Sequence, residues 1–346
     1  MCGDMITASF YQFHYSAVLK DNISFEEKNI NMENSQNFFQ STISKEIAIS
    51  GVKVVEKKKE MQEPQEIIPE NPIEESFVEE NNEHQEIIEE VPETLPTSVV
   101  QTNNLPESYN TLYKDIKIKN ETNFNLTQAI LTPDIEFSDK KNILIFHTHT
   151  CESYTQTQEN SYVASGNYRT TDLNYSVARV GTVLEESLTA KGFHVMHDMN
   201  YHDYPAYNGS YSRSFNTVKS LLEKNPTTQF VIDLHRDAIG SMNNYAPAVQ
   251  IGDETVAQVM FVIGTNGGGL EHPNWQTNLK FAIKIQEKAN EMYPGLFRPI
   301  ILRNSRYNQN LADSACIIEV GATGNTLEQT TGSMKYLAEV IYQVMQ

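Results

Sequence analysis

The chain has 346 residues, enough for two domains, and its formal charge of −19 at pH 7 is spread unevenly. Between Glu60 and Glu93 there are 13 glutamates and no lysine or arginine, so the rest carries −19 + 13 = −6. This balance excludes a broad basic surface, and we expect no nucleic-acid partner. The three cysteines include no CxxC pair and leave the redox compartment open.

The first third of the chain is predicted to lie outside the folded domain. Residues 1–55 are of mixed composition and are interpreted as a juxtamembrane-like region. Residues 56–107 are rich in Glu, Pro and Asn, and their few apolar residues cannot offset the entropy lost on ordering, which predicts a disordered acidic linker. The first residues, MCGDMITASFYQF, lack the charged and apolar regions of a signal peptide. The sequence contains no run of 18 or more apolar residues, so no transmembrane helix is predicted.

In residues 108–346 predicted strands alternate with predicted helices. The predicted strands are 143–146, 193–196, 230–234, 256–263, 299–302 and 315–320. The predicted helices are 177–188, 215–222, 279–292 and a last one that begins at Asn325 or Thr326. This alternation predicts an α/β domain with a mostly parallel, doubly wound sheet and helices on both faces.

Three of these strands end in groups that suit a metal site. The strand 143–146 runs into HTHTCE, which ends in Glu152, and the strand 230–234 runs into His235. A third strand carries Glu319 near its end. Because the carboxyl ends of parallel strands form one edge of a sheet, we expect these side chains to lie close together. Two histidines and one glutamate can hold a catalytic zinc with one position open for water, and a further glutamate can move protons.

His147 and His149 compete for the role of first ligand. If the strand continued through both, their side chains would point the same way. Only His149 has an acid three residues later. The predicted ligands are therefore His149, Glu152 and His235, and His147 is predicted to support these ligands without binding the metal. Glu319 has no evident buried partner in the sequence, and we interpret it as the catalytic base.

The remaining polar residues near these strands allow two interpretations each. Arg236 could clamp a substrate carboxylate and Asp237 could orient a ligating histidine, or both could form structural ion pairs. Cys151 as a nucleophile would lack a separate orienting group. Three further histidines on a strand and its following loop are interpreted as surface residues: His194, His197 and His202.

The segments HTHTCESY, DLHRDA and IIEVGATGNT, in this order, resemble the stage II sporulation protein P family. The resemblance covers the chain from about Lys141 to the C-terminus. This family comprises zinc-dependent cell-wall hydrolases of spore-forming bacteria, and its broader relatives are the zinc N-acetylmuramoyl-L-alanine amidases. In many of those amidases the second zinc ligand lies further from the first histidine, whereas the nearby match here is Glu152.

The resemblance implies zinc on His149, Glu152 and His235, and peptidoglycan cleavage between N-acetylmuramic acid and L-alanine, with stem-peptide endopeptidase activity also known in the family. It implies an extracytoplasmic, membrane-anchored protein at the forespore–mother cell septum, working in engulfment beside a lytic transglycosylase and a membrane partner. A zinc carboxypeptidase and a non-catalytic peptidoglycan-binding module are the alternatives. Glu319 argues against the second, because binding alone needs no general base.

Overall fold

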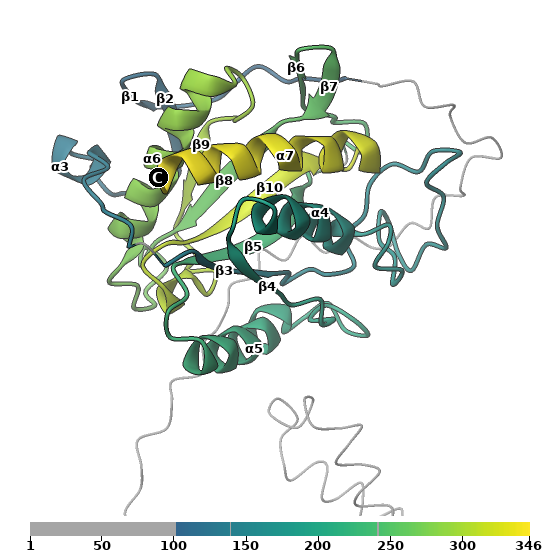
Figure 1. Ribbon diagram of the computed structural model, residues 1–346, viewed down its shortest axis with the longest axis horizontal. Coiled ribbons are helices and arrows are strands. Elements are labelled where there is room, and N and C mark those ends of the chain that lie inside the picture. The colour runs from purple at the N-terminus through teal and green to yellow at the C-terminus, as the bar shows by residue number, and fades with distance from the viewer. Residues whose placement is uncertain (1–101, 139, 241) are drawn as a thin grey trace, which may run out of the picture. The chain divides into compact units, whose positions relative to one another are not determined.

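The computed structural model describes residues 102–346 apart from 139 and 241 (Figure 1). The predictions for residues 1–55, and for all but the end of 56–107, therefore lie outside the described residues. Within the described part, no helix has both the length and the apolar character needed to cross a bilayer.

The centre of the fold is an eight-stranded sheet with the order β1-β2-β9-β8-β10-β5-β3-β4. Two neighbouring pairs, β1–β2 and β8–β10, are antiparallel and the other five are parallel, which confirms the predicted mostly parallel sheet. The strands are β1 (Thr111–Tyr113), β2 (Ile116–Asn120), β3 (Asn142–Phe146), β4 (His194–His197), β5 (Phe230–Asp237), β8 (Val259–Gly264), β9 (Ile300–Arg303) and β10 (Ala315–Ala322).

Two predicted strands differ in extent from the structure. The predicted strand 256–263 is split at Gln258, because residues before it form β7 (Glu254–Ala257), which pairs with β6 (Ala248–Ile251) outside the main sheet. The predicted strand 230–234 continues to Asp237, so His235 lies within β5 rather than after it.

Two of the longer helices, α4 and α7, begin at a residue whose side chain caps the helix. α4 (Val177–Thr189) starts at Ser176, whose side chain accepts a hydrogen bond from the Ala178 amide. α7 (Leu327–Val344) starts at Thr326 with a capping box. The other helices are α3 (Gln128–Leu131), α5 (Ser210–Lys224), α6 (Trp275–Met292) and the short 3₁₀ turn η1 (Gln309–Leu311).

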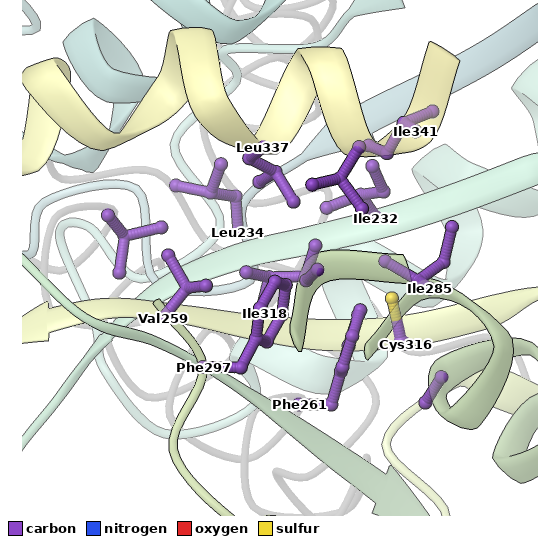
Figure 2. Packing of buried hydrophobic residues seen from close by; sticks show 14 of the residues in the cluster. Ile232, Leu234, Val259, Phe261, Ile285, Phe297, Cys316, Ile318, Leu337 and Ile341 are labelled. Atoms are coloured by element: carbon purple, nitrogen blue, oxygen red, sulfur yellow. The ribbon is translucent and has the colours of Figure 1, made fainter. Parts of the chain in front are cut away.

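Helices cover both faces of the sheet, as predicted. α4, α6 and α7 lie on one face and α5 on the other (Figure 1). Ile232 and Leu234 of β5 and Ile318 of β10 pack under α7 (Figure 2). Because side chains alternate along a strand, the residues between and after them point to the α5 face. This alternation directs His235 and Glu319 to the same face of the sheet.

Candidate metal centre

Two histidines and one glutamate meet at the carboxyl edge of β3 and β5. His149 Nδ1 lies 3.2 Å from Glu152 Oε1, and His235 Nδ1 lies 3.5 Å from Glu152 Oε2. One possible ligand atom from each residue lies within 4.8 Å of those of the other two residues, and all three residues are buried. A tight turn, closed by the Glu152 amide donating to the His149 carbonyl at 3.1 Å, sets the three-residue spacing. The carboxylate thus stands between two imidazoles.

The donor types of this group suit a zinc ion. Imidazole and carboxylate are the donors found in catalytic zinc sites. The two imidazole nitrogens face different oxygens of Glu152, at 3.2 and 3.5 Å, and one donor atom from each residue lies within 4.8 Å of the others. In a tetrahedral zinc site with bonds of about 2.0–2.1 Å, neighbouring ligand atoms lie about 3.3 Å apart. These three residues are therefore a candidate set of metal ligands.

The second nitrogen of each imidazole also has a polar neighbour. His235 Nε2 lies 2.8 Å from Asp233 Oδ1, and His149 Nε2 lies 3.2 Å from Ser210 Oγ. Asp233 is fixed in turn, because Thr148 donates to it from its amide at 2.7 Å and from its hydroxyl at 2.6 Å. The negative charge of Asp233 beside His235 Nε2 favours a proton on that nitrogen and a lone pair on Nδ1, although the 2.8 Å contact lies outside hydrogen-bond geometry. The sequence analysis missed Asp233, although it precedes His235 by two residues on one strand and so shares its face.

The charges of this group are strongly coupled. Burial opposes charge on His235, yet Asp233 and Glu152 raise the pKa of His235 well above its usual value. Burial likewise opposes charge on Glu152, yet His235 and His149 hold the pKa of Glu152 well below its usual range. Without a metal the group is an ion pair, and a bound cation would take the place of the proton on His235.

Glu319 stands next to His235 across the sheet. The two residues are paired in register on the parallel strands β10 and β5. Glu319 Oε2 is buried and has no hydrogen-bond partner among the described residues. Burial raises the pKa of Glu319 to about 8, although His235 acts in the opposite direction. A buried carboxyl with a raised pKa beside a candidate metal centre is suited to proton transfer.

The profile of the family Stage II sporulation protein P (SpoIIP) matches residues 15–342. The chain belongs to this family. It is 28% identical over 222 residues to stage II sporulation protein P of Bacillus subtilis (strain 168), a match that covers 60% of this chain and 51% of that protein. The chain therefore spans about half the length of this curated relative.

Solved amidase structures are similar at a lower level. The CwlD amidase from Clostridioides difficile, in complex with the GerS lipoprotein, is 16% identical, covers 60% of this chain and 97% of its own, and gives a TM-score of 0.38. The catalytic domain of CwlV, an N-acetylmuramoyl-L-alanine amidase from Bacillus (Paenibacillus) polymyxa, is 12% identical, covers 59% and 96%, and gives 0.36. These values are low, and no assignment of activity or residues rests on them.

In this SpoIIP family member, Asp237 and Arg236 both make polar contacts within the chain. Asp237 accepts a hydrogen bond from Arg298 Nη1 at 2.7 Å and so forms an ion pair, which is one of its two predicted roles. The carboxylate beside His235 belongs to Asp233. The buried Arg236 guanidinium donates to the carbonyls of Ser153 at 2.8 Å and Tyr168 at 3.2 Å. These contacts hold the loop after β3, and the Arg236 amide donates to Glu152 Oε2 at 3.2 Å. The role of Arg236 as a substrate clamp stays a prediction.

His147 uses both of its ring nitrogens for contacts outside the three-residue group. The strand ends at Phe146, so the expected alternation through His147 and His149 does not apply. His147 Nδ1 lies 2.7 Å from the Leu234 carbonyl and Nε2 lies 2.8 Å from His197 Nε2. Burial and the neighbouring His197 lower the pKa of His147 to about 3, so the ring is neutral at neutral pH.

The interpretation of the later histidines as surface residues is wrong for two of them. His202 is buried, with Nδ1 2.7 Å from the His147 carbonyl and Nε2 3.0 Å from Thr217 Oγ1. The His197 ring is enclosed between His147 and Glu185, whose Oε2 lies 3.3 Å away. The burial of these histidines depends on tertiary contacts that the sequence does not indicate, because the loop after β4 folds back over the end of β3. His194 is exposed, as expected.

Cys151 is not suited to nucleophilic chemistry. Its side chain is buried, and burial together with Asp203 raises the pKa of the Cys151 thiol to about 12. A thiol in this state carries almost no thiolate at neutral pH. The sequence likewise offered no separate group to orient Cys151 as a nucleophile.

Proposed function

We propose that this SpoIIP family member is a zinc-dependent peptidoglycan hydrolase that cuts the amide bond between N-acetylmuramic acid and L-alanine. The observation that carries the proposal is the buried group of His149, Glu152 and His235, whose donor atoms lie within 4.8 Å of one another, with Glu319 beside it. Membership of the family supports a role on the cell wall in sporulation.

The metal would be held by Nδ1 of His149, Nδ1 of His235 and a carboxylate oxygen of Glu152. When bound, zinc polarises a carbonyl and brings the pKa of its water to about 7. Asp233 supports this set, because a carboxylate 2.8 Å from His235 Nε2 favours the tautomer with a free lone pair on Nδ1.

Glu319 is the proposed general base. In its ionised form its carboxylate takes a proton from the attacking water and passes it to the nitrogen of the leaving amine, which otherwise would depart as an anion. Its side chain points to the same sheet face as His235, and its buried oxygen has no competing partner among the described residues. Asp237 and Arg298 are bound to each other, so neither takes this role in the arrangement described.

Membership of the family supports a proposal for the cellular setting. The proposed site of action is outside the cytoplasm at the forespore–mother cell septum, on a membrane-anchored form, during engulfment. Intact peptidoglycan is the proposed substrate, and a lytic transglycosylase and a membrane protein are the proposed partners.

Digestion of purified sacculi with mass spectrometry of the products tests the proposal. The zinc-loaded chain should release stem peptides with a free L-alanine amino group, and a chelator should stop the release. Fragments cut within the stem peptide would indicate an endopeptidase, and removal of the terminal residue alone would indicate a carboxypeptidase. Binding to sacculi without release of any product would favour the alternative function, a non-catalytic peptidoglycan-binding module.

A further inference from the structure

Exposed tyrosines gather in the loop between β4 and α5. Tyr201, Tyr204 and Tyr207 are 39%, 51% and 48% exposed, and we call these three residues the tyrosine ledge. Exposed aromatic rings spaced through one loop are unusual on a surface that meets only water, because aromatic side chains are enriched where a partner binds. The ledge is therefore a candidate binding surface.

The ledge is continuous with the candidate metal centre. The Tyr207 ring stacks on the His149 ring with centroids 4.7 Å apart, and the Arg169 guanidinium lies 5.2 Å from the centre of the Tyr207 ring. Arg169 pairs with Asp203 at 2.5 Å, and Asp203 accepts the Cys151 amide at 3.2 Å. The ledge is thus fixed to the same turn that carries His149 and Glu152.

The outer part of the ledge is held in place as well. Tyr201 donates from its hydroxyl to the Thr171 carbonyl at 2.6 Å. The Tyr201 and Tyr204 rings meet edge to face, with centroids 6.2 Å apart. A surface whose rings are already positioned loses little side-chain entropy when a ligand binds.

The strand order gives the two sides of the metal centre different roles. β10, β5, β3 and β4 lie next to one another in this order (Figure 1). Glu319, His235, His149 and then the ledge therefore follow in the same order along one edge of the sheet. A group that protonates the leaving amine must lie near its nitrogen. The leaving peptide therefore lies on the β10 side, and the acyl part of the scissile amide lies on the β4 side, where the ledge is.

We propose that the tyrosine ledge binds the glycan strand of peptidoglycan through its sugar rings. The inference rests on the proposed function, because in the amide between muramic acid and L-alanine the acyl part belongs to the sugar. The apolar faces of pyranose rings pack on aromatic rings, and the three exposed rings of the ledge offer such faces beside the metal centre. The stem peptide, by this assignment, contacts the opposite side of the centre.

The test measures the binding of peptide-free glycan strands to the full zinc-loaded chain by titration calorimetry. The variants are Tyr204→Ala, Tyr204→Phe and Tyr207→Ala, with Tyr109→Ala as the matched control, since Tyr109 is a comparably exposed tyrosine that lies just before β1, at the other end of the sheet. Loss of one stacking ring should weaken binding roughly fivefold or more, whereas Tyr204→Phe should stay close to wild type. Melting temperatures confirm that each variant is folded.

The outcomes separate the inference from the proposed function. Weakened glycan binding in both ledge alanine variants, with Tyr109→Ala unchanged, supports the ledge. Equal binding in all variants of a chain that still releases stem peptides from sacculi overturns the ledge and leaves the proposed function standing. A wild-type chain that releases no stem peptide overturns the proposed function, whatever the titration gives.

Discussion

His235 and Glu319 occupy paired positions on two neighbouring parallel strands, β5 and β10. The adjoining pair, Leu234 and Ile318, lies in the core beneath α7 (Figure 2). A candidate ligand and a candidate base are therefore positioned by backbone hydrogen bonds within a buried sheet, rather than by loops. We expect their separation to change little on substrate binding, because central strands are among the most stable parts of a fold.

Removal of a proposed ligand should remove the metal. His149→Ala and His235→Ala should each lose zinc, because two remaining protein donors do not make a stable site. His147→Ala should keep most of its zinc, since the His147 ring faces Leu234 and His197. Metal analysis of the three purified proteins decides this. Zinc retained in His149→Ala but lost in His147→Ala would reverse the assignment.

Asp233 and Asp237 form a matched pair for testing the support of the ligands. Asp233→Asn should lower zinc affinity by about 10- to 100-fold, because the carboxylate beside His235 Nε2 is replaced by a weaker acceptor. Asp237→Asn should leave zinc affinity near wild type, because Asp237 pairs with Arg298. Competition with a calibrated chelator measures both. The opposite ranking would show that Asp237 orients the ligand.

The sequence predicted the sheet well, because the apolar strands and amphipathic helices carry strong local periodicity. Because the carboxyl ends of parallel strands form one edge of a sheet, four side chains were predicted to lie together there: His149, Glu152, His235 and Glu319. In the structure the first three form one group, and Glu319 is paired in register with His235. The partners of Arg236 and Asp237 were not predictable. They depend on Tyr168 and Arg298, which are far away in the sequence and marked by no pattern.

Zinc binding should release protons at neutral pH. In the metal-free chain Asp233 and Glu152, against burial, hold the pKa of His235 well above its usual value, and burial raises that of Glu319 to about 8. Both groups are then protonated at pH 7, and a cation favours the deprotonated form of each. Apparent zinc affinity should rise with pH between 6 and 8 by up to about tenfold per unit for each displaced proton.

Calorimetry in buffers of different ionisation enthalpy counts the protons released. The variant Glu319→Gln has no titrating group at this position and should release fewer than wild type. An affinity that stays constant from pH 6 to 8 would contradict the protonation states assigned here.

Gly181 of α4 should not tolerate a methyl group. A Cβ atom there would lie 2.5 Å from His197 Nε2 and 2.9 Å from His147 Nε2, and both rings are held by hydrogen bonds. Alanine is the better helix former by about 1 kcal/mol. Crowding in a packed interior nevertheless costs about 1–3 kcal/mol, so Gly181→Ala should lower the free energy of unfolding. Urea denaturation checks this. The same substitution should cost markedly less in a His197→Ala background, and an equal cost would place the strain elsewhere.

The variant Glu319→Gln, assayed for zinc content and for release of stem peptides in one preparation, tests the account most directly. Glutamine keeps the shape of the side chain but cannot accept the proton from water. The variant should therefore hold as much zinc as wild type and cut about 100- to 10,000-fold more slowly, and the acidic limb of the pH profile should be lost. Loss of zinc would make Glu319 a ligand, and a rate near wild type would show that Glu319 is not the base.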